Sequence, residues 1–301
     1  MSGAAVSKPV AFITYAEAPD LTPSDQLAVA ALADRELQAR AVIWNDAKTD
    51  WAAFSALIMR SCWDYFLHPD EFSAWLEQME RAGIPVWNPI EMLRWNMDKY
   101  YLSDLQEAGV RIPPSLWLPK GARVQLAELL SERGWAQAVV KPVISAGAYR
   151  TLTVNAAEAA DAQTELEGML AEGAVLVQAF LEEVQSKGEW SLIFLGGEFS
   201  HAVLKTPGDG DFRVQEHLGG SVQAAEPPPY LVQQAEDILA QVDVDLLYAR
   251  VDGVEQDGQL ILMELELLEP SLFFEQAPGA AGRFAQLVVK WLENPSTQEA
   301  G

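Results

Sequence analysis

Short apolar runs alternate with segments of helical periodicity over the first third of the chain. Each run is bounded by polar or turn-forming residues and has the length of a buried strand. These runs occupy residues 9–15, 41–46, 56–60 and 84–89. A helix capped by Thr22 or Ser24 is predicted after the first run, and another begins at Pro69 and ends before Gly83. Strands alternating with helices predict a parallel sheet covered by helices.

The rest of the chain has the pattern of antiparallel sheets with added helices. The stretch "EWSLIFLGGEFSHAVLKTP" predicts a hairpin with Gly196-Gly197 at its tip, and "YARVDGVEQDGQLILMELELLEP" predicts another that turns near Asp257-Gly258. "AQAVVKPV" and "YRTLTV" predict two strands joined by "ISAGA", and "AVLVQAFLEEV" predicts a strand that runs into a turn. Helices are expected over residues 96–109, 124–134, 156–171, 230–241 and 281–293. The fold class is therefore α/β, with α+β character in the C-terminal half.

The composition argues against several classes of protein. The chain has 301 residues, a formal net charge of −24 and a single cysteine, Cys62. Nucleic-acid binding is not expected, because phosphate contacts need clustered Lys and Arg. No apolar run is long enough to span a bilayer, and the N-terminus lacks the pattern of a secretory signal. A disulfide within the chain is impossible, so these features together favour the cytoplasm and no membrane partner.

Carboxylates interrupt an otherwise apolar segment near the C-terminus. The stretch "LILMELELLEPSLFF" carries Glu264, Glu266 and Glu269. Side chains alternate faces along a strand, so Glu264 and Glu266 share a face, and Asp252 of the preceding strand can join them when the hairpin folds. Three adjacent carboxylates repel one another unless cations hold them, and an oxygen-only cluster suits Mg²⁺. The alternative is a solvent-exposed face of the sheet that carries these acids, and the strand considered alone favours this alternative.

A candidate phosphate site changes the balance between these two interpretations. Lys141 ends the apolar run "AVVKP" and is followed by a loop of small residues, Ser145, Ala146 and Gly147, whose backbone N–H groups can approach phosphate oxygens closely. Lys99, in "NMDKYYL", is a second candidate cation. The alternative for either lysine is a side chain that extends from the end of an element into water. "SAGA" is not a P-loop pattern.

The order of these motifs resembles that of the ATP-grasp superfamily over residues 88–275. The resemblance rests on "NMDKYYLSDLQEAGVRIPPSLWL", "VVKPVISAGAYRT", "VLVQAFLEE", "KGEWSLIFLGGEFSHAVLKTP", "YARVDGV" and "LILMELELLEP". The stretches "LMRSCWDYFLHPDEFSAWL" and "WNPIEMLRWNMDKYYL" are similar to a bacterial subgroup that includes the cyclo-ligase forming D-cycloserine from O-ureido-D-serine and ligases like glutathione synthetase. The resemblance implies an ATP-grasp fold with an N-terminal Rossmann-like domain over 1–95, a lid subdomain over 96–180 and a metal- and substrate-binding subdomain over 181–301.

The activity that the resemblance implies is carbon–nitrogen ligation or cyclisation driven by ATP and Mg²⁺. A small amino-acid-like carboxylate would be activated as an acyl phosphate, as in ring closure of the cycloserine type. A non-catalytic ATP-binding module of the same fold is the alternative. Superfamily members are often dimers, so a homodimer is possible.

The resemblance also implies roles for individual residues. For binding ATP, it implies Lys99, Lys141, Ser145, Ala146, Gly147, Gln178, Phe180, Leu181 and Glu189. For holding Mg²⁺, it implies Asp252, Glu264 and Glu266. For contacts with transferred phosphate or substrate, it implies Arg250, Lys205 and Arg213. The chain departs from the family pattern at Gln178, where Glu is usual, and at Glu266, where Asn is common.

The substrate is expected between a loop and the end of an N-terminal strand. The loop "RVQEHLGGS" offers Gln215, Gly219 and Gly220, and "RSCWDYF" offers Arg60, Trp63, Asp64 and Tyr65 at a strand end, where open α/β sheets bind ligands. The alternative to substrate binding by Trp63 and Tyr65 is that their rings pack between the domains. Glu269 either meets an ammonium or amide group of the substrate or caps the turn before Pro270. His201 and His217 are candidate bases with a structural role as the alternative, and Cys62 has no partners for a nucleophile.

Overall fold

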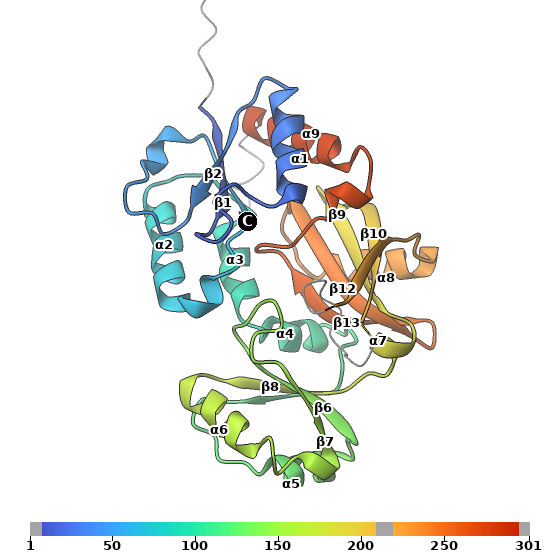
Figure 1. Cartoon of the computed structure of the whole chain (residues 1–301). Helices are drawn as coiled ribbons and strands as arrows, with labels where there is room; N and C mark the ends of the chain where they lie inside the picture. Colours follow the sequence, from blue (N-terminus) through green and yellow to red (C-terminus); the bar gives the residue numbers. More distant parts are fainter. Residues whose placement is uncertain (1–7, 209–218, 295–301) are drawn as a thin grey trace, which may run out of the picture.

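The N-terminal unit is built on a parallel sheet. The computed structural model describes residues 8–208 and 219–294 (Figure 1). The sheet has the order β2 (Ala39–Ile43), β1 (Val10–Thr14), β3 (Leu57–Ser61), β4 (Val86–Trp87), and every pairing is parallel. This confirms the predicted parallel sheet.

Helices from both ends of the chain cover this sheet. On one face, α1 (Pro23–Ala33) packs with the last helix, α9 (Ala280–Glu293), over the side chains of β1. On the other face lie α2 (Pro69–Arg81) and α3 (Ile90–Met97). The same unit contains the short 3₁₀ helices η1 (Trp51–Ala53), η2 (Tyr65–Leu67) and η5 (Phe274–Gln276). The C-terminal helix therefore completes the core of the N-terminal unit.

A smaller antiparallel sheet forms a separate lobe, drawn in green at the bottom of Figure 1. Its order is β5 (Ser115–Leu118), β8 (Val175–Ala179), β6 (Gln137–Pro142), β7 (Leu152–Asn155). One apolar cluster joins this sheet to α5 (Leu126–Arg133), η3 (Ala156–Glu158) and α6 (Gln163–Glu172).

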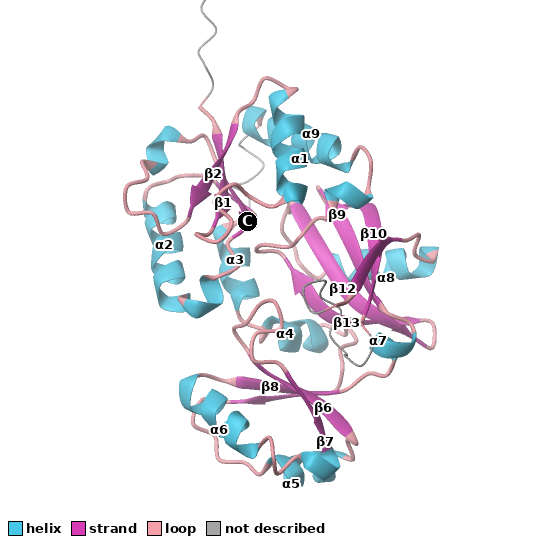
Figure 2. Cartoon of the chain, in the orientation of Figure 1, coloured by secondary structure: helices cyan, strands magenta, loops and turns pink. Residues whose placement is uncertain are grey.

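The third sheet is antiparallel and larger, and it stands at the right of Figure 2. Its order is β11 (Ser221–Ala224), β10 (Glu198–Thr206), β9 (Glu189–Leu195), β12 (Tyr248–Gln256), β13 (Gln259–Glu266). Helix α8 (Pro229–Leu239) packs on one face, and α7 (Glu183–Ser186) contacts β12. Both predicted hairpins are present, with turns at Gly196-Gly197 and Asp257-Gly258.

Two predicted helices are wrong in their extent. The helix expected over 96–109 is divided into α3 and α4 (Tyr101–Glu107), because Asp98 is extended and its carboxylate accepts the N–H of Tyr100 at 2.9 Å. The break places Lys99 between the helices, where its N–H donates to the carbonyl of Val143. The helix expected over 156–171 begins as η3, and α6 starts only at Gln163. No helix in the described part of the chain is long and apolar enough to cross a membrane.

Candidate active site

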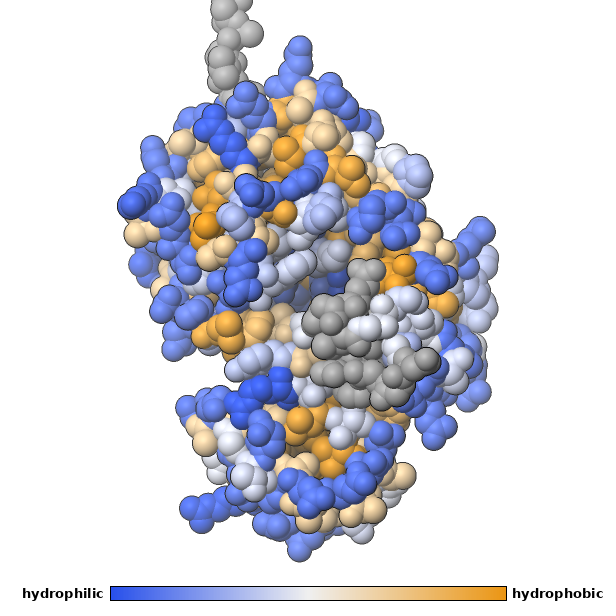
Figure 3. Space-filling model, in the orientation of Figure 1, coloured by the Kyte–Doolittle hydropathy of each residue, from blue (hydrophilic) through white to orange (hydrophobic). Residues whose placement is uncertain are grey.

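A cavity of about 740 Å³ lies between the three sheets. Each unit contributes to its wall, for example Tyr65 from the N-terminal unit, Lys141 from the lobe and Asp252 from the large sheet. Figure 3 shows the surface narrowing between the lobe and the rest of the molecule. The volume is in the usual range for small-molecule sites.

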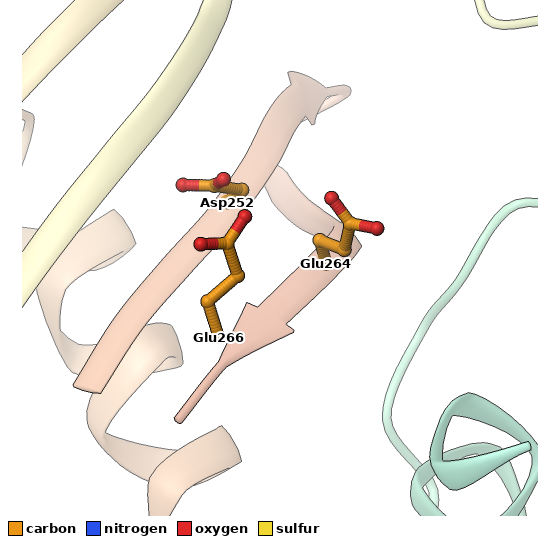
Figure 4. Close-up of side chains that lie close together, drawn as sticks. All are labelled: Asp252, Glu264 and Glu266. Carbon is orange, nitrogen blue, oxygen red and sulfur yellow. The ribbon is translucent and has the colours of Figure 1, made fainter. Parts of the chain in front are cut away.

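Three carboxylates converge on one wall of this cavity. Arg250 pairs with Glu266, and Asp252 pairs with Glu264, across the β12–β13 hairpin. One oxygen from each of Asp252, Glu264 and Glu266 lies within 4.8 Å of the others (Figure 4). The predicted convergence of these acids is therefore confirmed.

A β-bulge produces this convergence. From the turn inward, the hairpin runs from Gln256 opposite Gln259 to Gly253 opposite Leu262, a register that would next place Asp252 opposite Met263. Met263 is instead the extra residue of the bulge, and Asp252 lies opposite Glu264. Residues directly opposite one another share a face, so the bulge turns the two glutamates onto the face of Asp252.

Two lysines approach Glu264 from the lobe side. Lys99 Nζ lies 3.0 Å and Lys141 Nζ 3.9 Å from Glu264 Oε1. Lys99 also donates to the carbonyl of Ser145 at 2.6 Å, which ties the small-residue loop to the site. Burial opposes the charged form of Glu264, but the two lysines outweigh it and hold its pKa at about 2. Burial in turn lowers the pKa of Lys141. Lysines and loop thus meet the acids, as the phosphate-site hypothesis requires.

Two further cations form ion pairs with the remaining acids. Arg250 lies 2.9 Å from Asp252 and 2.5 Å from Glu266, while Lys205 lies 3.2 Å from Asp252 and also pairs with Glu189. Burial disfavours the Asp252 carboxylate, but Arg250 and Lys205 outweigh it and hold its pKa at about 2. Burial raises the pKa of Glu266 to about 7 despite Arg250, and the neighbouring carboxylates add to the rise.

The donor set fits a divalent cation. All three acids offer oxygen, and their ligand atoms lie within 4.8 Å of one another. Oxygen ligands shared between carboxylates and phosphates are the usual environment of Mg²⁺. The residues present therefore fit Mg²⁺ bound together with a polyphosphate.

The other predicted nucleotide residues line the same cavity beside apolar side chains. They are Ser145, Ala146, Gly147, Gln178, Phe180, Leu181 and Glu189. The Gln178 amide donates to Ser115 Oγ at 2.9 Å and is buried. The Glu189 carboxylate is occupied by Lys205. Their individual roles towards ATP stay predictions.

Three supporting residues escaped the sequence reasoning. Ser191 donates to Asp252 Oδ1 at 2.5 Å and so orients that carboxylate. Asn96 bonds the carbonyl of Leu265 and the N–H of Leu267, and the Tyr101 hydroxyl accepts the N–H of Leu265. Asn96 and Tyr101 thereby satisfy the outer edge of β13, the strand that carries Glu264 and Glu266. No local signal marks the Asn96 amide for this role, because its partners on β13 lie 169 and 171 positions away in the sequence.

Two of the predicted substrate residues are wrong. Arg60 is 1% exposed, pairs with Asp25 at 2.7 Å and donates to the carbonyl of Pro270, so it is not part of the cavity wall. Asp64 accepts the Trp44 indole N–H at 2.7 Å and is not part of the wall either. Both side chains are bound by structural partners that come from elsewhere in the chain.

The other predicted substrate residues divide into three groups. Trp63, Tyr65 and Glu269 line the cavity, as do Lys205 and Arg250. Gly219 and Gly220 are absent from the wall formed by the described residues. Arg213 and Gln215 lie outside the described residues, together with His217.

His201 has a structural environment. Its ring bonds the carbonyl of Leu272 at 2.8 Å and Ser200 Oγ at 3.0 Å. Both ring nitrogens are therefore engaged, which supports the structural alternative.

Two family models match the chain. Residues 10–88 match the model described as "D-cycloserine synthetase DcsG, N-terminal domain", and residues 121–256 match "Prokaryotic glutathione synthetase, ATP-grasp domain". Both matches fall on the units that form the cavity.

Curated relatives and solved structures agree with these models. Cycloserine biosynthesis protein DcsG of Streptomyces lavendulae is 30% identical over 83% of this chain and 87% of its own length. A probable alpha-L-glutamate ligase of Parasynechococcus marenigrum (strain WH8102) is 27% identical over 62% of this chain and 39% of its own length. A crystal structure of D-cycloserine synthetase DcsG covers 94% of this chain and 99% of its own at a TM-score of 0.85 and 28% identity. A D-alanine–D-alanine ligase from Bacillus anthracis complexed with ATP has the same fold at a TM-score of 0.69 and 16% identity, covering 98% of this chain and all of its own.

Proposed function

The chain belongs to the ATP-grasp ligase family, and on this premise we propose that it closes a ring within one small amino-acid-like substrate. The ATP-dependent ligase activity follows from the family. The proposal adds that the activated carboxylate and the attacking nitrogen belong to the same molecule. Its support is the likeness to D-cycloserine synthetase along nearly the whole chain, N-terminal unit included.

The observation that carries the chemistry is the convergence of three acids and four cations around one cavity. A carboxylate does not condense with a nitrogen at neutral pH unless it is activated. In the proposed reaction a substrate carboxylate oxygen attacks the γ-phosphorus of ATP, giving an acyl phosphate and ADP. The substrate nitrogen then attacks the acyl carbon and loses its proton, the C–N bond closes the ring, and phosphate leaves with its oxygen.

The side chains contribute mainly position and charge. Lys99 and Lys141, which meet at Glu264, are proposed to hold phosphate oxygens of ATP. Arg250, fixed by Asp252 and Glu266, is proposed to stabilise the negative charge on the acyl phosphate. Preorganised cations of this kind lower the barrier because they need not rearrange as charge develops.

Asp252, Glu264 and Glu266 are proposed to hold Mg²⁺. When bound, the ion neutralises phosphate charge and orients the γ-phosphoryl group. Ser191 would keep the Asp252 carboxylate aimed at the ion. The reaction is proposed to occur in the cytoplasm, where ATP is abundant and the buried thiol of Cys62 stays reduced. A homodimer is a further proposal, tested by light scattering.

The test is a turnover assay with one substrate and no added amine. We expect O-ureido-D-serine to stimulate release of ADP and phosphate by the purified chain in the presence of ATP and Mg²⁺. Mass spectrometry should detect the cyclic product. A requirement for a second, separate amine would instead identify an intermolecular ligase and exclude ring closure.

A further inference from the structure

The cavity has an acidic corner that the metal ligands do not use. We propose that Glu269 and Tyr65 bind a primary ammonium group of the substrate, so that the enzyme takes an amino acid and discriminates against the matching acid without its amino group. The inference rests on the proposed function, because it describes the substrate end of the same site.

Glu269 carries a buried carboxyl group that forms no ion pair with the described cations. It lines the cavity and is 8% exposed. Within residues 8–208 and 219–294 no cation pairs with it, and no N–H of another residue bonds its carboxyl group. The nearby cations are already engaged, Lys99 by Glu264 and Arg250 by Asp252 and Glu266. A buried carboxylate in this state is costly unless a cation joins it.

Tyr65 supplies a second acceptor on the wall of the same cavity. Its side chain is 4% exposed and lines the cavity, and its hydroxyl has no hydrogen-bond partner among the described residues. Burial raises the pKa of Tyr65, and Glu269, which lines the same cavity, is the charge that adds most to the rise. The hydroxyl is therefore available to accept a hydrogen bond from a group bound in the cavity.

The backbone around Glu269 is held in place from the N-terminal unit. The Trp63 indole N–H donates to the carbonyl of Glu269 at 3.0 Å, and Arg60 donates to the carbonyl of Pro270 at 2.8 Å. The Arg60 guanidinium is itself fixed by Asp25. The carboxylate is thus presented on a rigid turn, as a binding group should be.

An ammonium group fits this corner better than other ligand groups. It brings three N–H donors and a full positive charge to a carboxylate and a hydroxyl that both accept. The indole of Trp63 also lines this cavity, and aromatic rings attract cations. Burial, with Glu266 adding to it, raises the pKa of Glu269 to about 8, and an ammonium group would offset both effects and favour the carboxylate form, which a neutral amide cannot do.

The test compares two pairs of probes that differ only in the amino group. The first pair is O-ureido-D-serine and the same molecule with hydrogen in place of the amino group. The second pair is D-alanine and propanoate. Calorimetry on the full chain with Mg²⁺ and a non-hydrolysable ATP analogue gives the dissociation constant of each probe.

We expect the parent chain to bind the amino member of a pair about 10- to 150-fold more tightly, the range for hydrogen bonds to charged groups. Glu269→Gln, which has the same shape, should bring this ratio to within about threefold, and Tyr65→Phe should lower it in part. Glu275→Gln is the matched control, since Glu275 is exposed on η5 and should keep the full ratio. Binding of the ATP analogue should stay unchanged in all variants, which also shows that they fold.

Three outcomes would overturn the subsite. They are equal binding within both pairs by the parent chain, an unchanged ratio in Glu269→Gln, or loss of ATP-analogue binding in that variant, which would assign Glu269 to the nucleotide site. A preserved ammonium preference without turnover of O-ureido-D-serine would overturn the proposed ring closure and leave the subsite standing.

Discussion

One added methyl group at Gly253 should dismantle the acidic cluster. A Cβ at this position would lie 2.7 Å from the carbonyl oxygen of Ile261 and 2.8 Å from Leu260 Cδ1. The leucine side chain can turn aside, but the carbonyl belongs to β13, so Gly253→Ala must push the two strands apart beside the bulge. Asp252 precedes Gly253 directly and faces Glu264 across that bulge.

The size of the effect follows from two terms. Overpacking a buried position of this kind costs about 1 to 3 kcal/mol in the free energy of unfolding. Displacing one ligand or its support in a metal site lowers metal affinity by about 10- to 100-fold. We therefore expect Gly253→Ala to weaken ATP binding by about that factor when Mg²⁺ is present, and by much less when it is chelated.

Urea unfolding and calorimetric titration with ATP, with and without Mg²⁺, measure the two terms. Gly173→Ala is the matched control, because nothing lies within 4 Å of its added Cβ and its φ of −159° suits any residue. If Gly253→Ala keeps both the stability and the Mg²⁺-dependent affinity of the parent, the bulge does not build the site and the reasoning is wrong.

The remaining predictions concern single charges. Asp25→Asn should lower the free energy of unfolding, measured in urea, by about 3 to 5 kcal/mol, because it leaves the buried Arg60 guanidinium without its counter-ion. The double variant Asp25→Leu with Arg60→Met should recover most of the lost stability. A double variant as unstable as the single one would contradict this prediction. Glu264→Gln should weaken Mg²⁺-dependent ATP binding at least about tenfold in calorimetry and spare binding without Mg²⁺, whereas equal losses would argue against a metal ligand. The folded-state pKa of Glu269, about 8, lies above the usual value of 4.5, so between these two pH values the folded chain keeps a proton that the unfolded chain has lost. The stability that the protonated form contributes is complete below pH 4.5 and is lost as the pH rises through 8. Glu269→Gln should thus leave stability unchanged near pH 4.5 and raise it by a few kcal/mol near pH 9 in urea unfolding, and a difference independent of pH would refute the assignment.

Local patterns predicted the elements wherever neighbours in sequence decide the structure. Period-two alternation and the two glycine turns give the hairpins of β9–β10 and β12–β13. Helical spacing gives α1 and α2, with Thr22 as the cap of α1. The pattern failed at Asp98, where a carboxylate that bonds the backbone outcompeted a helix of good periodicity.

Distant partners account for the errors in the site. Arg60 stands at the end of β3, where a ligand residue would stand, but Asp25 and the carbonyl of Pro270 occupy its guanidinium. Asn96 gave no sign that its amide would complete the edge of β13. Such pairings join segments far apart in sequence, so no local pattern contains them.

The sequence by itself determined which residues could carry the chemistry. It supplied lysines in apolar surroundings and acids two residues apart on one strand, because residue type and strand period are local properties. Only the tertiary structure decided that these groups meet. A hairpin closed at Asp257-Gly258 in unbroken register would turn Glu264 and Glu266 away from Asp252, and one extra residue at Met263 reverses their face. That bulge depends on the packing between strands and on the absence of a side chain at Gly253.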